Sequence, residues 1–259
     1  MLYAAYLGVI AGLLPVYLGL IPLWFFKGLS EGRRTLLLSF SAGILFFLFA
    51  DVTHEGTELS QAPGSTPILF AVGLVLGLLG PVAITHIRKR RVLSRDPGTP
   101  LAPHPVPNGN AKLFVAQMIA LGIGLHNLGE GLAIGAAYAA GTFVLTNLLV
   151  IGFALHNSTE GLGISGPIAS RPTGLKQPLL LGFVAGAPTI LGSMIGSLAF
   201  SAALGTLFFA AAAGALLYVI IELLKVSSTS GRTTSVFGGI VLGILVMFGT
   251  GFLVKFAMG

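Results

Sequence analysis

Eight apolar runs, each long enough to cross a lipid bilayer, account for most of the chain. A membrane-spanning helix needs about 20 mostly apolar residues, and short polar stretches separate runs of about that length here. The runs predict spanning helices at residues 3–26, 34–53, 66–87, 112–140, 142–166, 178–200, 203–225 and 235–258. The pattern therefore predicts an all-α, polytopic membrane protein in which residues 1–259 form a single transmembrane domain.

Composition narrows the class of protein further. The chain is 54% hydrophobic and only 8% charged, outside the range of soluble globular domains. Its net charge of +6 would suggest a nucleic-acid partner in a soluble protein. Here the basic residues flank the apolar runs, so we expect the lipid bilayer and no nucleic acid as partner. The chain has no cysteine, which excludes thiolate ligands and disulfides.

The basic residues also predict the orientation. Of the 14 Lys and Arg residues, all but Lys255 lie in or beside the first, third, fifth and seventh loops. Cytoplasmic loops carry an excess of Lys and Arg, so we expect these loops in the cytoplasm, both termini outside, and the plasma membrane as location. The third loop, residues 88–111, is the longest, and its basic run and prolines predict an extended cytoplasmic linker.

Two similar polar motifs interrupt the fourth and fifth runs. They read His-Asn-Leu-Gly-Glu-Gly-Leu from His126 and His-Asn-Ser-Thr-Glu-Gly-Leu from His156. The apolar stretch between them predicts a helical hairpin that turns near Gly141. Each histidine then lies about 22 Å from the turn, at 1.5 Å per residue. We therefore expect the two motifs to meet at the same depth in the membrane.

The spacing within each motif indicates a metal site. Residues at i and i+4 share a helix face, and residues at i and i+3 lie on a neighbouring one. Two opposed faces would bring imidazoles, carboxylates and amides into one small volume, which is a ligand set for a divalent ion. The residues concerned are His126, Asn127, Glu130, His156, Asn157 and Glu160.

Buried charge requires an explanation in such a chain. Asp51, Glu130, Glu160 and Glu222 lie within or at the edge of predicted spans, and four ionised carboxylates there would cost on the order of 10 kcal/mol without compensation. One alternative is that the motif histidines and asparagines only hydrogen-bond across the hairpin while the glutamates stay protonated. If a metal binds, two glutamates neutralise one divalent ion, and a second ion would need more negative charge nearby.

Polar residues outside the motifs suggest an entry and an exit for the ion. Asp51, His54, Glu55 and Glu58 lie on one face at the outer end of the second span, where they predict a vestibule that attracts cations. A solvated helix end is the alternative. Glu222, near the inner end of the seventh span, predicts an exit ligand, or alternatively a simple partner for Lys225.

On these features the chain resembles the ZIP family of divalent metal transporters. The resemblance rests on the two His-Asn-x-x-Glu-Gly motifs, the eight spans with outside termini and the variable loop between the third and fourth spans. It implies an inverted 3+2+3 helix bundle in which spans 1–3 and 6–8 are inverted repeats around spans 4 and 5. It also implies import of zinc or iron into the cytoplasm and a homodimer.

The resemblance further implies how the ligands divide between two metal sites. A first site would use His126, Glu130, His156 and Glu160, and a second would use Asn127 and Asn157 and share the two glutamates. The family pattern includes an acid before the proline of the sixth span, where this chain has Ala187 before Pro188. A two-metal centre is therefore in doubt.

Three functions fit the sequence, and a transporter fits best. We expect divalent transition metal, zinc foremost and iron, cadmium or manganese as alternatives, to be the transported substrate. An intramembrane metal-dependent hydrolase would need a base that is not itself a ligand, and the equivalent positions of the two glutamates set neither apart. A structural or sensory protein with a metal clasp is the third reading. No phosphate-binding loop occurs, so nothing couples transport to ATP, and we expect no enzymatic activity.

Overall fold

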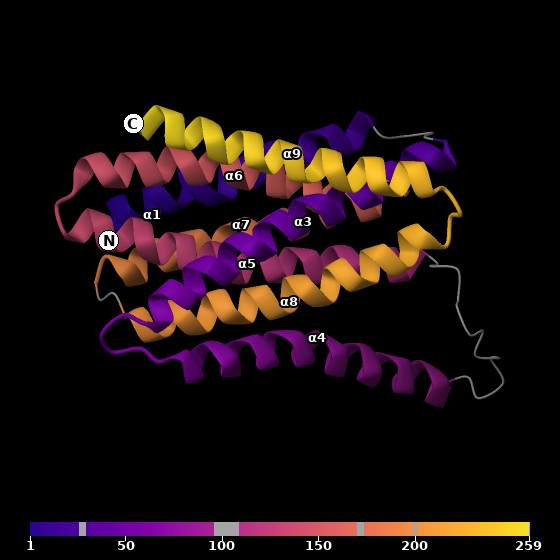
Figure 1. Ribbon diagram of the computed structural model, residues 1–259, viewed down its shortest axis with the longest axis horizontal. Coiled ribbons are helices and arrows are strands. Elements are labelled where there is room, and N and C mark those ends of the chain that lie inside the picture. The colour runs from indigo at the N-terminus through magenta and orange to yellow at the C-terminus, as the bar shows by residue number, and fades with distance from the viewer. Residues whose placement is uncertain (26–29, 96–108, 170–173, 199–200, 259) are drawn as a thin grey trace.

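The computed structural model describes residues 1–25, 30–95, 109–169, 174–198 and 201–258. Within them the chain forms eight helical rods and no strand (Figure 1). The first rod is subdivided, and the other seven are single helices. In chain order the elements are α1 (Leu2–Gly8), η1 (Val9–Leu13), α2 (Leu14–Leu20), η2 (Ile21–Phe25), α3 (Glu31–Ser60), α4 (Pro67–Arg95), α5 (Gly109–Ala139), α6 (Phe143–Ile168), α7 (Lys176–Gly196), α8 (Ala202–Ser228) and α9 (Thr233–Met258).

The eight predicted spans are confirmed as helices, with some shifts at their ends. Helix α3 continues beyond residue 53 to Ser60, so the polar residues at its outer end are helical. Residues 88–95, expected in the long loop, continue α4, and Gly109–Ala111 already belong to α5. The rest of that predicted loop, residues 96–108, lies outside the described residues. The long polar linker is therefore shorter at both ends than its composition predicts.

Seven of the described helical segments are long and apolar enough to cross a membrane. The exception is α6, whose middle carries the second polar motif and so lowers its mean hydropathy. The rods run roughly parallel, and both chain ends lie at the same end of the bundle (Figure 1). An even number of spans requires this arrangement.

The helix contacts show an internal two-fold symmetry. It exchanges the first rod with α7, α3 with α8, α4 with α9, and α5 with α6. The first rod (α1 to η2) packs on α6 as α7 packs on α5, and α4 packs on α8 as α9 packs on α3. The contacts between α5 and α6, between α3 and α8, and between α1 and α7 map onto themselves under this exchange. This is the pattern of an inverted 3+2+3 bundle, with α5 and α6 at its centre.

Glycines next to the two motifs allow the central helices to approach their neighbours closely. A Cβ atom added to Gly131 would lie 2.3 Å from the Thr189 carbonyl oxygen of α7, and one added to Gly161 would lie 2.3 Å from the Val16 carbonyl oxygen of α2. Both distances are shorter than van der Waals contact, so only glycine fits. Each motif is thereby pressed against the backbone of a neighbouring rod. The hairpin turn forms at Gly141, with φ +73°, as predicted.

Candidate metal centre

The hairpin of α5 and α6 brings the two histidines together in the bundle interior. Helix α5 carries the first motif and α6 the second, and the His126 and His156 ring centroids lie 5.7 Å apart. His126, Glu130 and His156 each offer a ligand atom, and these atoms all lie within 4.8 Å of one another. The prediction that the motifs meet at the same depth therefore agrees with the structure.

The spacing of the donor atoms suits a small divalent ion. Nε2 of His126 lies 3.2 Å from Oε1 of Glu130 and 3.7 Å from Oε1 of Glu160. Nε2 of His156 lies 3.5 Å from the same Glu160 oxygen. Zinc–nitrogen and zinc–oxygen bonds of about 2.0–2.1 Å place neighbouring ligands of a tetrahedron about 3.4 Å apart. The observed separations bracket that value, so each of these donor pairs is spaced like two neighbouring ligands of one zinc-sized ion. Glu160 is close to both histidines, but it is not part of the group whose ligand atoms all lie within 4.8 Å of one another.

The same atoms lack ordinary partners. By normal distance and angle criteria, neither ring nitrogen of His126, nor Nε2 of His156, nor either oxygen of Glu160 is hydrogen-bonded to any described residue. The side chains of His126, Glu130 and Glu160 are no more than 3% exposed, and that of His156 is 13% exposed. Buried polar atoms in a folded protein are normally hydrogen-bonded. Orphaned nitrogen and oxygen atoms that converge in this way are instead characteristic of a cation site.

Both asparagines are fully buried, and both are oriented by their amide nitrogens. Nδ2 of Asn127 donates to the Ala185 carbonyl of α7 at 3.0 Å, and Nδ2 of Asn157 donates to the Ala11 carbonyl of η1 at 2.9 Å. The two contacts correspond under the two-fold exchange. In both residues Oδ1 has no hydrogen-bond partner among the described residues. The oxygen, which is the atom an asparagine offers to a metal, is therefore left free on each side.

The two glutamates differ in their support. Oε2 of Glu130 accepts a hydrogen bond from Asn157 Nδ2 at 2.8 Å. The same amide nitrogen also donates to the Ala11 carbonyl. Glu160 accepts none from the described residues. The Glu130 carboxylate is thus held by a hydrogen bond, whereas Oε1 of Glu160 has the two imidazoles as neighbours, at 3.5 and 3.7 Å.

Comparison with known families agrees with this geometry. Residues 105–254 match the family described as ZIP zinc transporter. That stretch contains both motifs and more than half of the chain. The chain belongs to the ZIP family. It is therefore a multi-pass membrane protein of a family of divalent metal transporters, and the expected resemblance is confirmed. No curated protein matches the chain.

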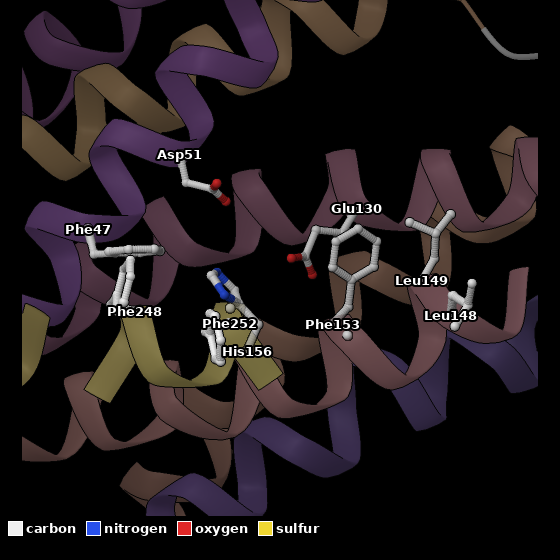
Figure 2. A pocket seen from close by; sticks show the side chains of 11 residues that line it. Phe47, Asp51, Glu130, Leu148, Leu149, Phe153, His156, Phe248 and Phe252 are labelled. Atoms are coloured by element: carbon white, nitrogen blue, oxygen red, sulfur yellow. The ribbon is translucent and has the colours of Figure 1, made fainter. Parts of the chain in front are cut away.

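The predicted entry residue Asp51 lies beside the candidate metal centre. A cavity of about 480 Å³ is lined by Asp51 of α3, Glu130 of α5 and His156 of α6. Their polar ends face a common space (Figure 2). The remaining lining is apolar and comes from α3, α6 and α9: Phe47, Leu148, Leu149, Gly152, Phe153, Phe248, Gly251 and Phe252. Asp51 is half-buried, and the family match does not extend to it.

The other predicted entry residues are farther out on the same helix. His54, Glu55 and Glu58 are exposed, and Nε2 of His54 lies 3.4 Å from Oε1 of Glu58. None of the three lines the cavity. Their role in entry stays a prediction, and the solvated-end alternative describes their surroundings as well.

The predicted exit residue Glu222 has a partner. Nζ of Lys225 donates to Oε1 of Glu222 at 2.9 Å, one turn along α8. This is the pairing that the alternative interpretation predicted. The role of Glu222 as an exit ligand stays a prediction. Ala187, in place of the acid expected in the family, lies on α7 close to the Ala185 carbonyl that Asn127 contacts.

Two neighbours of the centre were missed by sequence reasoning. Phe209 of α8 packs against His126, with ring centroids 5.9 Å apart, and a Cβ atom on Gly129 would lie 2.7 Å from its ring. Fully buried Met247 of α9 lies behind the second motif, where its sulfur accepts a hydrogen bond from Thr159 Oγ1 at 2.8 Å. Both residues look like ordinary core positions in an apolar helix, so no local signal marks them.

Proposed function

We propose that this ZIP protein imports a divalent transition metal, zinc foremost, into the cytoplasm through the centre between α5 and α6. The observation that carries the proposal is the set of buried, unpartnered donor atoms spaced at about the edge of a zinc tetrahedron. Iron, cadmium and manganese are alternative substrates, since nitrogen and oxygen donors accept all of them. The ion is cargo, so the centre must both bind and release it.

The cavity supplies the approach from the outer half of the bundle. Asp51 of α3 lines this cavity, together with His156 and Glu130, which belong to the centre itself. A hydrated cation that meets Asp51 exchanges water for carboxylate and then for imidazole. His54 and Glu55, one turn farther out on α3, would concentrate cations at the mouth. On the other side, Glu222 would receive the ion by exchanging its contact with Lys225.

We propose that one ion binds at a time. Glu130 and Glu160 together neutralise one divalent charge. A second ion at Asn127 and Asn157 would need a further acid, and Ala187 supplies none. The asparagines then contribute their free Oδ1 atoms as the ion passes, while His126, Glu130, His156 and Glu160 form the resting site.

The proposed location, direction of transport and oligomeric state rest on the charge of the loops and on the family. With the basic loops in the cytoplasm, both chain ends lie outside the plasma membrane, and the centre releases metal inward. A homodimer is the assembly that the family implies. We propose a carrier and no enzyme, because both glutamates are within reach of the ion and neither is left as a separate base.

Metal flux into proteoliposomes tests this proposal. Replacing both Glu130 and Glu160 by glutamine removes the charge and keeps the volume, and we expect zinc uptake to fall by more than about 100-fold. The matched control is Glu31→Gln, which removes an exposed carboxylate at the start of α3, 3.7 Å from Arg232. Uptake of zinc, cadmium, manganese and iron that is unchanged in the double variant would show that the pathway lies elsewhere.

A further inference from the structure

One side chain connects a metal ligand to the backbone of the first rod. The Asn157 amide nitrogen donates both to Oε2 of Glu130 at 2.8 Å and to the Ala11 carbonyl at 2.9 Å. Asn157 and Ala11 are fully buried. The orientation of the Glu130 carboxylate therefore depends on a backbone oxygen of another helix.

The Ala11 carbonyl lacks its α-helical donor because of the local sequence. Ala11 lies in η1, a π-helical segment in which the N–H of Leu14 bonds back to the carbonyl of Val9. In an α-helix the Ala11 carbonyl would accept from the N–H of residue 15. That residue is Pro15, which is buried and has no N–H. Asn157 thus donates to a buried carbonyl whose α-helical donor is missing.

The backbone beside Ala11 is fixed in place. A Cβ atom added to Gly12 would lie 2.1 Å from Thr189 Oγ1 of α7, so the two rods touch at this level. The carbonyl that orients Asn157 is consequently part of a tightly packed crossing. Such a fixed acceptor limits how far the Asn157 amide, and with it Glu130, can rotate.

We propose that Pro15 is a positioning residue for the metal centre. By withholding an N–H from Ala11, it keeps the Ala11 carbonyl directed to Asn157, and Asn157 holds Glu130 in the orientation that binds metal. The inference rests on the proposed function for its metal readout, although the chain of contacts itself exists without metal.

The symmetry-related contact provides a matched control. Asn127 donates to the Ala185 carbonyl of α7, but the proline of that helix is Pro188, only three residues later. Because Pro188 has no N–H, the carbonyl that loses its α-helical donor is that of Val184. The α-helical donor to the Ala185 carbonyl is Thr189, which has an N–H. Substitution of Pro188 therefore leaves the acceptor of Asn127 unchanged.

The test is a double-mutant cycle in the full chain, using Pro15→Ala, Asn157→Ala, their combination, and Pro188→Ala. Zinc affinity is measured by equilibrium titration, and the unfolding midpoint is measured without metal. We expect Pro15→Ala alone to weaken zinc binding by about threefold to tenfold, because the new N–H competes for the carbonyl. Added to Asn157→Ala, it should weaken zinc binding no further. Without metal, Pro15→Ala should raise the unfolding midpoint more in the Asn157→Ala variant than in the unsubstituted chain. In that variant the Ala11 carbonyl has lost the Asn157 donor, and the new N–H of residue 15 replaces it.

Three results distinguish a failure of the positioning role from a failure of the proposed function. Equal loss of zinc affinity from Pro15→Ala in both backgrounds would overturn the positioning role, and so would an equal coupling of Pro188→Ala to Asn157→Ala. If the unsubstituted chain binds no divalent ion while the metal-free cycle is still non-additive, the positioning contacts stand and the proposed function fails. Asn157→Ser replaces Asn157→Ala in the cycle if the alanine variant does not fold.

Discussion

The two motifs have almost the same sequence, but their histidines and glutamates have different surroundings in the structure. Glu130 from α5 and His156 from α6 line the cavity and form an open pair, whereas His126 and Glu160 do not line it and form a closed pair. The open pair and the closed pair thus each contain one residue from each motif. Motif repetition provides the side-chain types, and the crossing of the two helices decides which of them face the cavity.

The support of the ligands differs in the same way. Glu130, in the open pair, is held by Asn157, and the closed carboxylate of Glu160 accepts no hydrogen bond from the described residues. A buried carboxylate that accepts no hydrogen bond is unfavourable. A cation that enters past the open pair is therefore attracted to the closed one. The comparison suggests an order of binding, from His156 and Glu130 to His126 and Glu160.

Chemical labelling gives the largest expected difference between the pairs. Diethyl pyrocarbonate should modify His156 about tenfold faster than His126. The helices must open further to expose His126 to the reagent, and an extra free-energy cost of about 1.4 kcal/mol slows a reaction tenfold. The basis is the cavity position of His156 and its 13% side-chain exposure against 3% for His126. Mass spectrometry of each modified peptide measures the rates, and bound zinc should protect both histidines. Equal rates without metal would contradict the division into open and closed pairs.

The asparagines should differ by a smaller factor. Asn157→Ala removes two hydrogen bonds and releases Glu130, whereas Asn127→Ala removes one. At about 0.5–1.5 kcal/mol per bond, we expect zinc affinity to fall by about tenfold for Asn157→Ala and about threefold for Asn127→Ala. Competition titration against a fluorescent chelator measures both constants. A larger loss from Asn127→Ala would reverse the assigned support.

The entry residue should give the smallest effect. Asp51→Asn removes the cavity charge without touching the donor atoms of the centre, so uptake should fall by about threefold at scarce zinc and little at saturating zinc. The control is Glu31→Gln, at the other end of α3 and outside the cavity. Uptake at several zinc concentrations separates capture from turnover. An equal fractional loss at every concentration would remove Asp51 from the capture step.

Much of this fold was readable from the chain because membrane helices are encoded locally. The eight spans follow from apolar run length, the hairpin turn follows from Gly141, and the pairing of the motifs follows from their equal distance to that turn. The ends of α3 and α4 were less accurate, because a helix continues into polar sequence wherever its backbone stays hydrogen-bonded.

The supporting contacts of the centre could not be read in this way. Asn157 and Ala11 are 146 positions apart, and Thr159 and Met247 are 88 apart. Which carbonyl an asparagine contacts depends on the crossing of two rods, and no residue type at either position indicates it. The division into open and closed pairs depends on the same crossings.

The central claim is that one ion lies between the two histidines and the two glutamates. Anomalous diffraction at the zinc edge, from crystals of the full chain soaked in zinc, tests it most directly. We expect a single strong peak within about 2.0–2.2 Å of His126 Nε2, His156 Nε2 and one oxygen each of Glu130 and Glu160. A peak elsewhere in the bundle, with these four side chains making no contact to it, would contradict the account.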